Sequence, residues 1–206
     1  MRDNLAASLR LLLVTDDAYL DGHDAVALCR GAVAGGVTAV QLRLKRADDR
    51  TFFTLADRLR EALDVPLFIN DRVDIALAAG AAGAHLGPDD IAPMLARQIV
   101  PTGFVIGASV GSHEEIERAR SADYWGIGPL HVSPTKHDAG VALGWDGARA
   151  MLQSAGPRPC VVIGGVTPED VNLASAAGFA GVAVSGGILT AIDVEQAARR
   201  YAISEK

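Results

Sequence analysis

The sequence predicts a (β/α)₈ barrel in a single domain spanning residues 1–206, and three observations lead to this fold class. Short apolar segments alternate with helical segments along the whole chain, at a spacing of about 25 residues. The apolar segments are continuous, which is typical of parallel strands buried on both faces. Eight such βα units can be counted, and eight parallel units close into a barrel. A doubly wound open sheet is the competing architecture.

The first four units follow from apolar segments that end at polar residues or glycines. Residues 9–15 form the first expected strand, and Asp24 caps a helix that ends at Gly35-Gly36. Gly80 stops the short helix that follows the third strand. The other expected strands of this half are 39–43, 67–70 and 84–86, and the expected helices are 24–34, 49–63, 73–79 and 91–98.

The last four units continue the same alternation. Ser112 is the expected N-cap of one helix, and Pro168 is expected to open another helix at its first turn. The expected strands are 105–109, 124–127, 160–163 and 181–184, and the expected helices are 113–120, 145–153, the one opened by Pro168, and 194–201. No linker, low-complexity tract or second domain interrupts this order.

The composition argues against several classes of function. The formal net charge is −6, which does not favour a nucleic-acid-binding surface, although a locally basic pocket can still bind an anionic substrate. Cys29 and Cys160 lie far apart without metal-ligand spacing, so we interpret both as buried thiols in a reducing compartment. No segment has the about 20 apolar residues of a membrane span, and no signal-peptide pattern is present. We therefore expect a cytoplasmic protein that acts on small molecules, and a homo-oligomer is compatible with the sequence.

The segment YWGIGPLHVSPTK, at 124–136, combines a buried strand with an anion-binding loop. The apolar strand breaks at Gly128-Pro129, and the loop that follows carries the hydroxyls of Ser133 and Thr135 and the ammonium group of Lys136. Loops at the carboxyl ends of barrel strands form the active sites of this fold. The segment therefore predicts binding of a phosphorylated ligand.

Two cations alternate with leucines at the end of the second strand. In the segment VQLRLK, the alternation of a strand places Gln41, Arg43 and Lys45 on one face. Leu42 and Leu44 then face the helix layer, so the two cations should point into the mouth of the barrel and bind an anion there. A solvent-exposed pair of cations at a strand end is the alternative.

Carboxylates follow the third and fourth strands. Asn70 and Asp71 end the third strand, and Asp90 follows the fourth, so the two carboxylates can meet across the rim of a barrel. Carboxylates with a neighbouring amide and water suit Mg²⁺. Alternatively, Asp90 or Asp89 caps the next helix. His85 is either a core histidine or a ligand, and we include it among the candidate substrate-binding residues.

Glycine pairs follow the last two strands. Gly164-Gly165 comes after the seventh strand, and Gly186-Gly187 comes after the eighth strand, preceded by Ser185. These two loops are the usual phosphate site of a barrel, because their backbone N–H groups are accessible. Tight turns without a ligand are the alternative. Ser109, at the end of the fifth strand, is expected at the same mouth.

Together these residues predict two anion sites. The first resembles a Mg²⁺–pyrophosphate site and comprises Arg43, Lys45, Asn70, Asp71, Asp90 and Lys136. The second is a phosphomonoester site at the glycine-rich loops. Joining two phosphorylated substrates with loss of pyrophosphate would use both sites, whereas isomerisation of one sugar phosphate would use only the second.

Ordered motifs along nearly the whole chain resemble those of thiamine-phosphate synthases. They are LLLVTD at 11–16, VQLRLK at 40–45, INDRVDIALA at 69–78, GAHLGPDD at 83–90, IGASVGSHEE at 106–115, DYWGIGPLHVSPTKHDA at 123–139, VIGGVTPEDV at 162–171 and GVAVSGGI at 181–188. The resemblance implies a barrel transferase that couples hydroxymethylpyrimidine pyrophosphate to hydroxyethylthiazole phosphate, or its carboxylate, and releases pyrophosphate. It also implies a Mg²⁺-dependent dissociative mechanism, in which pyrophosphate leaves before the thiazole nitrogen attacks.

Matched position by position, the resemblance implies a role for each candidate. The implied contacts of the pyrimidine pyrophosphate are Gln41, Arg43, Lys45, Asn70 and Lys136, with Ser109 near the pyrophosphate. The implied Mg²⁺ ligands are Asp71 and Asp90. The implied contacts of the thiazole phosphate are Ser133, Thr135, Gly165, Ser185 and Gly186. We assign catalysis to Arg43, Lys45, Ser109 and Lys136.

Three departures from the family pattern leave other interpretations open. Pro88 stands where Gln is common, His131 with Val132 replaces a frequent Phe-Pro pair, and Gly186 stands where Ser is usual. Thiazole tautomerase is the nearest alternative family. Its catalytic histidine follows the glycine of the sixth strand, where this chain has Pro129, but His131 lies close by. A non-catalytic relative that binds a phosphorylated ligand is the third interpretation.

Overall fold

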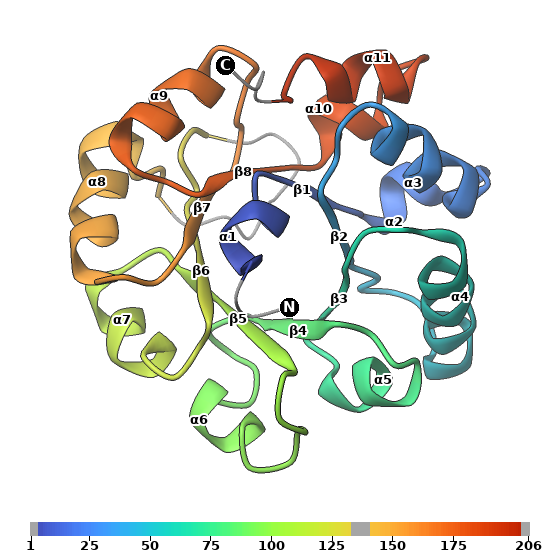
Figure 1. The fold of residues 1–206 in the computed structure, drawn as a ribbon, viewed down its shortest axis with the longest axis horizontal. Helices are drawn as coiled ribbons and strands as arrows, with labels where there is room; N and C mark the ends of the chain where they lie inside the picture. The colour runs from blue at the N-terminus through green and yellow to red at the C-terminus, as the bar shows by residue number, and fades with distance from the viewer. Residues whose placement is uncertain (1–3, 133–140, 203–206) are drawn as a thin grey trace.

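Eight parallel strands close into a barrel in the computed structural model, which describes residues 4–132 and 141–202 (Figure 1). The strands are β1 (Leu11–Val14), β2 (Ala39–Leu42), β3 (Leu67–Asn70), β4 (Gly83–Leu86), β5 (Val105–Val110), β6 (Tyr124–Ile127), β7 (Cys160–Ile163) and β8 (Gly181–Val184). Each strand pairs with the next along the chain, and β8 pairs with β1. The closed barrel confirms the predicted fold class. A doubly wound sheet is excluded, because it would leave two edge strands unpaired.

Helices follow the strands and surround the barrel, except for the first helix, which lies over its centre (Figure 1). They are α1 (Leu5–Ser8), α2 (Asp17–Leu20), α3 (Ala25–Ala34), α4 (Asp49–Ala62), α5 (Val73–Ala78), α6 (Pro93–Ala96), α7 (His113–Ala119), α8 (Gly144–Ser154), α9 (Asp170–Ala177), α10 (Gly186–Leu189) and α11 (Val194–Arg199). Two predicted N-caps are confirmed. Asp24 accepts a hydrogen bond from the N–H of Val26 at 3.0 Å, and Ser112 accepts one from the N–H of Glu115 at 3.4 Å.

Two helices, α6 and α9, begin later than predicted. α6 occupies only Pro93–Ala96 instead of 91–98, and its proline lies in the first turn. α9 begins at Asp170, so Pro168 lies in the turn before the helix and does not open it. The helices α1, α2 and α10 have four residues each, and a single turn is too short to produce a detectable 3.6-residue period.

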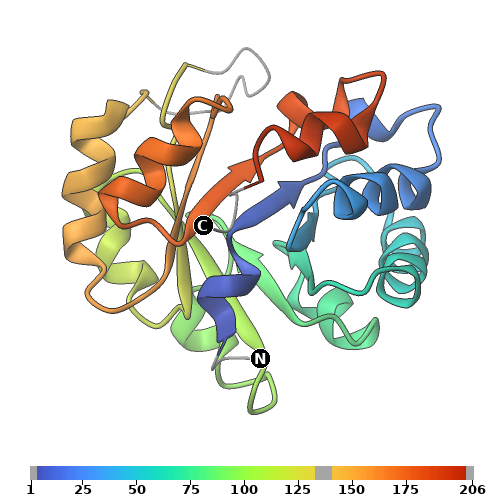
Figure 2. The same cartoon turned by 45° about the horizontal axis from the view of Figure 1, so that its top comes forward.

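The apolar core has two layers. One layer lies between the strands and the surrounding helices, and the other fills the interior of the barrel with side chains such as Leu12, Phe68 and Tyr124. Leu5 of α1 and Leu9 pack into the inner layer. The helix α1 therefore closes the amino-terminal end of the barrel, over whose centre it lies (Figures 1 and 2).

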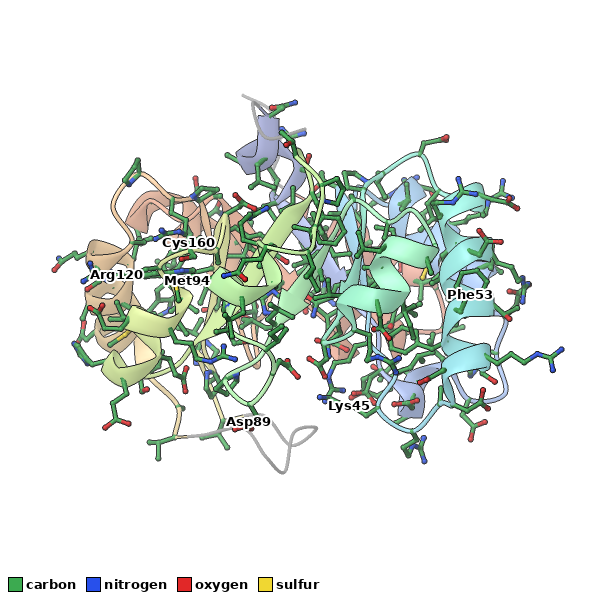
Figure 3. All side chains as sticks on the ribbon, turned by 90° about the horizontal axis from the view of Figure 1, so that it is seen from below. Lys45, Phe53, Asp89, Met94, Arg120 and Cys160 are labelled. Carbon is green, nitrogen blue, oxygen red and sulfur yellow. The ribbon has the colours of Figure 1, made fainter. Side chains whose placement is uncertain are left out.

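The opposite end of the barrel is not covered by α1, and the candidate functional site lies there. Lys45 and Asp89 lie at the end away from α1, where the carboxyl ends of the strands meet the loops (Figure 3). Barrel enzymes carry their active sites at this end. The fold thus places Lys45 at the end where a barrel site is expected.

The two cysteines are buried free thiols, as predicted. Burial raises the pKa of Cys29 and of Cys160 to about 12 each, so both thiols remain protonated near neutral pH. Across residues 4–132 and 141–202, no helix has the length and apolar character needed to cross a bilayer.

Candidate active site at the carboxyl ends of the strands

A cavity of about 700 Å³ opens at the carboxyl ends of the strands, and we call it cavity A. The predicted site residues that line it are Gln41, Arg43, Asn70, His85 and Ser109. They come from β2, the end of β3, β4 and β5, so four successive strands contribute to one wall. Leu42 and Leu44 pack in the outer apolar layer, as the alternation along β2 predicts.

A second cavity, cavity B, has a volume of about 390 Å³ and adjoins the first. The predicted residues Gly165, Ser185 and Gly186 line it. Arg43 and Gly164 line both cavities, so the two spaces meet at these residues. Two ligands could therefore lie side by side at the mouth of the barrel.

A wider hollow of about 920 Å³ lies between the α2–α3 segment and α4. It is lined by Arg46, Arg50 and Arg58 together with Asp17, Asp21 and Asp24 among others. None of the predicted site residues lines it. We place the site in cavities A and B because the strand ends open there.

Gln41 and Asn70 form a buried amide pair in cavity A. The Nε2 group of Gln41 donates to Oδ1 of Asn70 at 2.7 Å, and the two residues are 4% and 8% exposed. This bond uses the amino end of Gln41 and the carbonyl end of Asn70. The carbonyl oxygen of Gln41 and the amino group of Asn70 are consequently the ends that can meet a ligand.

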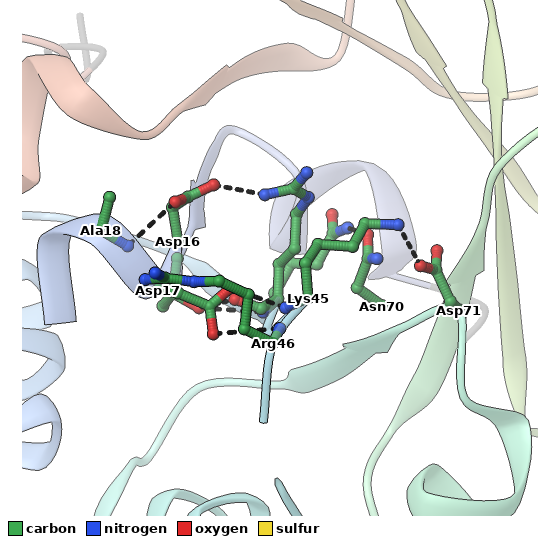
Figure 4. Close-up of polar contacts among 10 residues, drawn as sticks. Asp16, Asp17, Ala18, Lys45, Arg46, Asn70 and Asp71 are labelled. Atoms are coloured by element: carbon green, nitrogen blue, oxygen red, sulfur yellow. Dashed lines mark hydrogen bonds and ion pairs between the residues drawn. The ribbon is translucent and has the colours of Figure 1, made fainter. Parts of the chain in front are cut away.

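Arg43 is held at the junction of the cavities by Asp16, a residue that sequence analysis does not select. The guanidinium group of Arg43 forms an ion pair with Asp16. The same carboxylate accepts a hydrogen bond from the N–H of Ala18 at 3.1 Å and so caps α2 (Figure 4). Thr15 fixes the backbone, since its Oγ1 accepts from the N–H of Arg43 at 2.8 Å. The only sequence signal for Asp16 is its position directly after the first strand.

Lys45 and Asp71 form an ion pair at the rim of the mouth (Figure 4). Nζ of Lys45 lies 2.5 Å from Oδ2 of Asp71, and the lysine side chain is half exposed. The backbone of Asp71 has a φ of 63°, in the left-handed region that Asp and Asn adopt more readily than most residues. Its N–H donates to the carbonyl oxygen of His85 at 2.8 Å, which holds the end of β3 against β4.

The Asp90 side chain forms a hydrogen bond within the loop that follows β4. Its Oδ2 accepts a hydrogen bond from the N–H of Gly87 at 2.6 Å, and Arg118 donates to the carbonyl oxygens of Gly87 and Asp90. The alternative that Asp90 or Asp89 caps the next helix is wrong, because α6 begins later, at Pro93, without a side-chain cap. Sequence analysis does not select Arg118, because its role depends on contacts between α7 and the loop after β4.

The chemistry of Asp71 and Asp90 fits a divalent cation. Burial, followed by a hydrogen bond with Asp71, raises the pKa of Asp90 to about 6. A carboxylate whose ionisation is opposed by burial and by a neighbouring carboxylate gains from a bound cation. In the described part of the chain, no group of three or more His, Cys, Asp or Glu side chains is arranged to hold a metal. The pair would therefore leave other coordination positions to water or to ligand oxygens, as Mg²⁺ prefers.

Glycines around cavity B allow neighbouring segments of the backbone to lie close to one another. Gly164 and Gly165 have φ values of 94° and 66°, which favour glycine, and they bring this loop against the segment after β6. A Cβ atom on Gly186 would lie 2.9 Å from the hydroxyl of Tyr19. Tyr19 also lines cavity B, and sequence analysis gives no signal for it because it belongs to the short helix α2.

His85 is a core histidine that also lines cavity A. The residue is 7% exposed, and Nε2 of its ring lies 3.0 Å from Oγ of Ser109. His85 is thus both a core histidine and a candidate ligand-binding residue. Its ring is buried inside the barrel and also contacts the Ser109 hydroxyl on the wall of cavity A.

His131 does not line cavity A or cavity B. Nε2 of its ring lies 3.0 Å from Oδ2 of Asp170, and the same carboxylate oxygen accepts from the N–H of Thr167 at 2.9 Å. This contact ties the segment after β6 to the start of α9, so among the described residues the His131 ring is engaged with Asp170 and does not line either cavity. The predicted residues Ser133, Thr135 and Lys136 lie outside the described residues.

The family model, the curated relatives and a similar solved structure point to one family. A family model described as thiamine monophosphate synthase matches residues 11–188. The thiamine-phosphate synthase of Azorhizobium caulinodans is 43% identical over 199 residues, covering 93% of this chain and 92% of that protein. That of Syntrophomonas wolfei is 40% identical over 195 residues, covering 92% and 93%. The solved structure of thiamine phosphate pyrophosphorylase from Pyrococcus furiosus has a TM-score of 0.86 at 34% identity, covering 96% of each chain.

Proposed function

This chain belongs to the thiamine monophosphate synthase family, and on that premise we propose that its barrel joins hydroxymethylpyrimidine pyrophosphate to hydroxyethylthiazole phosphate. The reaction is an alkyl transfer with pyrophosphate as the leaving group. The observation that carries the proposal is the contact between cavities A and B at Arg43 and Gly164. Two phosphorylated substrates need two adjoining sites, whereas an isomerase that acts on one phosphate needs one.

Cavity A is the proposed site of the pyrimidine pyrophosphate. The amide pair of Gln41 and Asn70 offers one acceptor and one donor, which suits the amino group and ring nitrogen of an aminopyrimidine. Arg43 and Lys45 lie at the mouth, where their positive charges attract the pyrophosphate. Lys136 is proposed as a third cation on the strength of its position in the family motif.

Asp71 and Asp90 are the proposed ligands of Mg²⁺. When bound, the ion would neutralise part of the charge of the pyrophosphate and orient it for departure. Lys45 pairs with Asp71 at 2.5 Å. Its ammonium group is therefore placed to exchange this carboxylate for a phosphate oxygen of the substrate.

Cavity B is the proposed site of the thiazole phosphate. Backbone N–H groups of Gly165, Ser185 and Gly186 belong to the loops after β7 and β8, where barrels commonly bind phosphate. Ser133 and Thr135 are proposed to add hydroxyl donors from the loop after β6. This arrangement would direct the thiazole nitrogen toward cavity A.

The proposed reaction has two bond changes. The bond between the pyrimidine methylene carbon and the bridging oxygen breaks, and its electron pair leaves with the pyrophosphate. The lone pair of the thiazole nitrogen then forms the new carbon–nitrogen bond with the methylene cation. Neither step transfers a proton. The task of Arg43, Lys45 and Ser109 is therefore to stabilise charge on the departing oxygens, and the task of the cavities is to align the reacting atoms.

Two substitutions test the assignment of the cavities. Asn70→Asp keeps an acceptor for Gln41 but adds a negative charge to cavity A, so it should raise the KM for the pyrimidine pyrophosphate about tenfold. Gly186→Val should raise the KM for the thiazole phosphate by a similar factor, because its side chain collides with Tyr19. Each variant should leave the other KM unchanged. The assignment is wrong if both substitutions change the same KM.

A further inference from the structure

A chain of hydrogen bonds links cavity A to the interior of the barrel through Ser109, His85 and Tyr124. Oγ of Ser109 lies 3.0 Å from Nε2 of His85, and Nδ1 of the same ring lies 3.0 Å from the hydroxyl of Tyr124. Ser109 and His85 line cavity A, whereas Tyr124 is 0% exposed. The Tyr124 hydroxyl cannot touch a ligand, so any effect that it has on the reaction acts through His85.

A glycine on β5 leaves the space in which the His85 and Tyr124 side chains form their hydrogen bond. Gly107 pairs with His85 of β4 on one side and with Tyr124 of β6 on the other. A Cβ atom on Gly107 would lie 2.2 Å from Cζ of Tyr124 and 2.6 Å from Nδ1 of His85. The absence of a side chain at this position lets the two rings meet across β5.

The proton of the Tyr124 hydroxyl fixes the tautomer of His85. Burial raises the pKa of Tyr124, so the phenol keeps its proton. A buried hydroxyl must donate its proton to an acceptor, and within residues 4–132 and 141–202 the partner of this hydroxyl is Nδ1 of His85. Because a neutral imidazole has one acceptor and one donor nitrogen, Nε2 of His85 carries the ring hydrogen.

This tautomer makes Ser109 a donor toward cavity A. Nε2 of His85 lies 3.0 Å from Oγ of Ser109, and with the hydrogen on Nε2 the ring donates this bond, so that the serine proton is directed away from the ring and toward the cavity. In the other tautomer, Nε2 would accept the serine proton, and Ser109 would present only lone pairs to a ligand. A phosphate oxygen accepts hydrogen bonds and is repelled by lone pairs.

We propose that Tyr124 is a positioning residue that, through His85, makes Ser109 a hydrogen-bond donor to the phosphate oxygens of a diphosphate ester in cavity A. The inference rests on the proposed function, which assigns the diphosphate to this cavity. Negative charge on these oxygens grows as the ester bond breaks, so the bond from Ser109 strengthens in the transition state. Loss of this donor lowers kcat more than it raises KM.

Kinetics of three variants test the proposal. Tyr124→Phe removes only the hydroxyl group and should lower kcat about tenfold, with a change in the KM for the pyrimidine pyrophosphate below about twofold. Ser109→Ala should lower kcat at least as much. The double variant should be no slower than Ser109→Ala alone, because both substitutions act through one hydrogen bond. An unchanged kcat in Tyr124→Phe, or independent effects that multiply in the double variant, would overturn the proposal.

Nitrogen NMR of the wild-type histidines tests the tautomer without an assay of activity. The resonances of His85 are identified by their loss in His85→Gln. The expected spectrum shows hydrogen on Nε2 and none on Nδ1 of this residue, and the reverse pattern would overturn the proposal even if Tyr124→Phe does not fold. The expected tautomer in a wild-type protein that forms no product would instead overturn the assignment to this reaction.

Discussion

Arg118 donates hydrogen bonds to the backbone carbonyl oxygen of Asp90, and through the same guanidinium group to that of Gly87. The residue thus clamps the loop that presents the Asp90 carboxylate. Replacing Arg118 with Met removes both bonds while keeping the aliphatic stem. We expect the Mg²⁺ concentration for half-maximal activity to rise about tenfold, because the loop is no longer fixed around its carboxylate. A titration of activity with Mg²⁺ measures this.

Arg120→Met is the matched control for this prediction. Arg120 follows the same helix, but its side chain is exposed, and its ion pair in the described part of the chain is with Glu117 at 2.6 Å. Such exposed pairs contribute little to stability. The clamp is disproved if both variants respond to Mg²⁺ in the same way.

Asp71 carries a charge and also has an unusual backbone conformation. The substitution Asp71→Asn removes the charge and keeps the conformation. Asn tolerates the left-handed φ of 63° as well as Asp does, so the variant should fold like the wild type. Loss of the carboxylate should lower kcat at least about 100-fold at saturating Mg²⁺, while the protein still binds the pyrimidine pyrophosphate. Calorimetric binding together with turnover checks both expectations. Full turnover in the variant would remove Asp71 from the proposed metal site.

Asp170 should stabilise the fold through its bonds to Thr167 and His131. Burial opposes its ionisation, but these hydrogen bonds outweigh burial and hold the pKa of Asp170 below its usual value. The ionised carboxylate therefore contributes stability above about pH 4, the pKa of Asp in the unfolded chain, and loses it as the pH falls through the folded pKa. We expect Asp170→Asn to lower the free energy of unfolding by about 2 kcal/mol at pH 7.

Urea unfolding at pH 7 and pH 3 measures this dependence. The difference between wild type and Asp170→Asn should shrink at the lower pH, where the wild-type carboxyl group is also losing its charge. Asp146→Asn is the control. The Asp146 side chain is fully exposed, and this substitution removes an exposed ion pair with Arg149 at 3.7 Å. A constant difference at both pH values would contradict the assigned role of the charge.

Gly107→Ala should disturb the interior of the barrel. Its Cβ would lie 2.2 Å from the Tyr124 ring, whose position is fixed by the surrounding core. Overpacking of this kind costs about 3 kcal/mol. Gly126→Ala is a graded control, because its Cβ would lie 3.2 Å from the His85 ring and requires a smaller shift. Thermal or urea unfolding should rank Gly107→Ala as the less stable variant, and the opposite order would contradict the account of the inner layer.

Much of the barrel is predictable because its strands are continuous apolar runs that end at polar residues. The bounds of β3, β6, β7 and β8 agree with the prediction, since Asp71, Gly128, Gly164 and Ser185 mark their ends in the sequence. Arg43 and Asn70 could be predicted for the same reason. Each occupies a fixed place at the end of a strand, and alternation decides its face.

The contacts across the site could not be predicted in this way. The pairing of Asp16 with Arg43, the clamp of Arg118 and the approach of Tyr19 to Gly186 depend on which elements become neighbours in space. No periodicity along the chain encodes those distances. The four-residue helix α1 likewise has too few residues to reveal that it closes the barrel.

The most direct test of the proposed reaction is release of pyrophosphate when the protein is mixed with Mg²⁺ and both phosphorylated substrates, with and without EDTA. We expect release that requires the metal and both substrates, with thiamine phosphate formed in equal amount. No release from well-folded protein, or release that continues with the thiazole phosphate omitted and yields no thiamine phosphate, would contradict the proposed coupling of the two cavities.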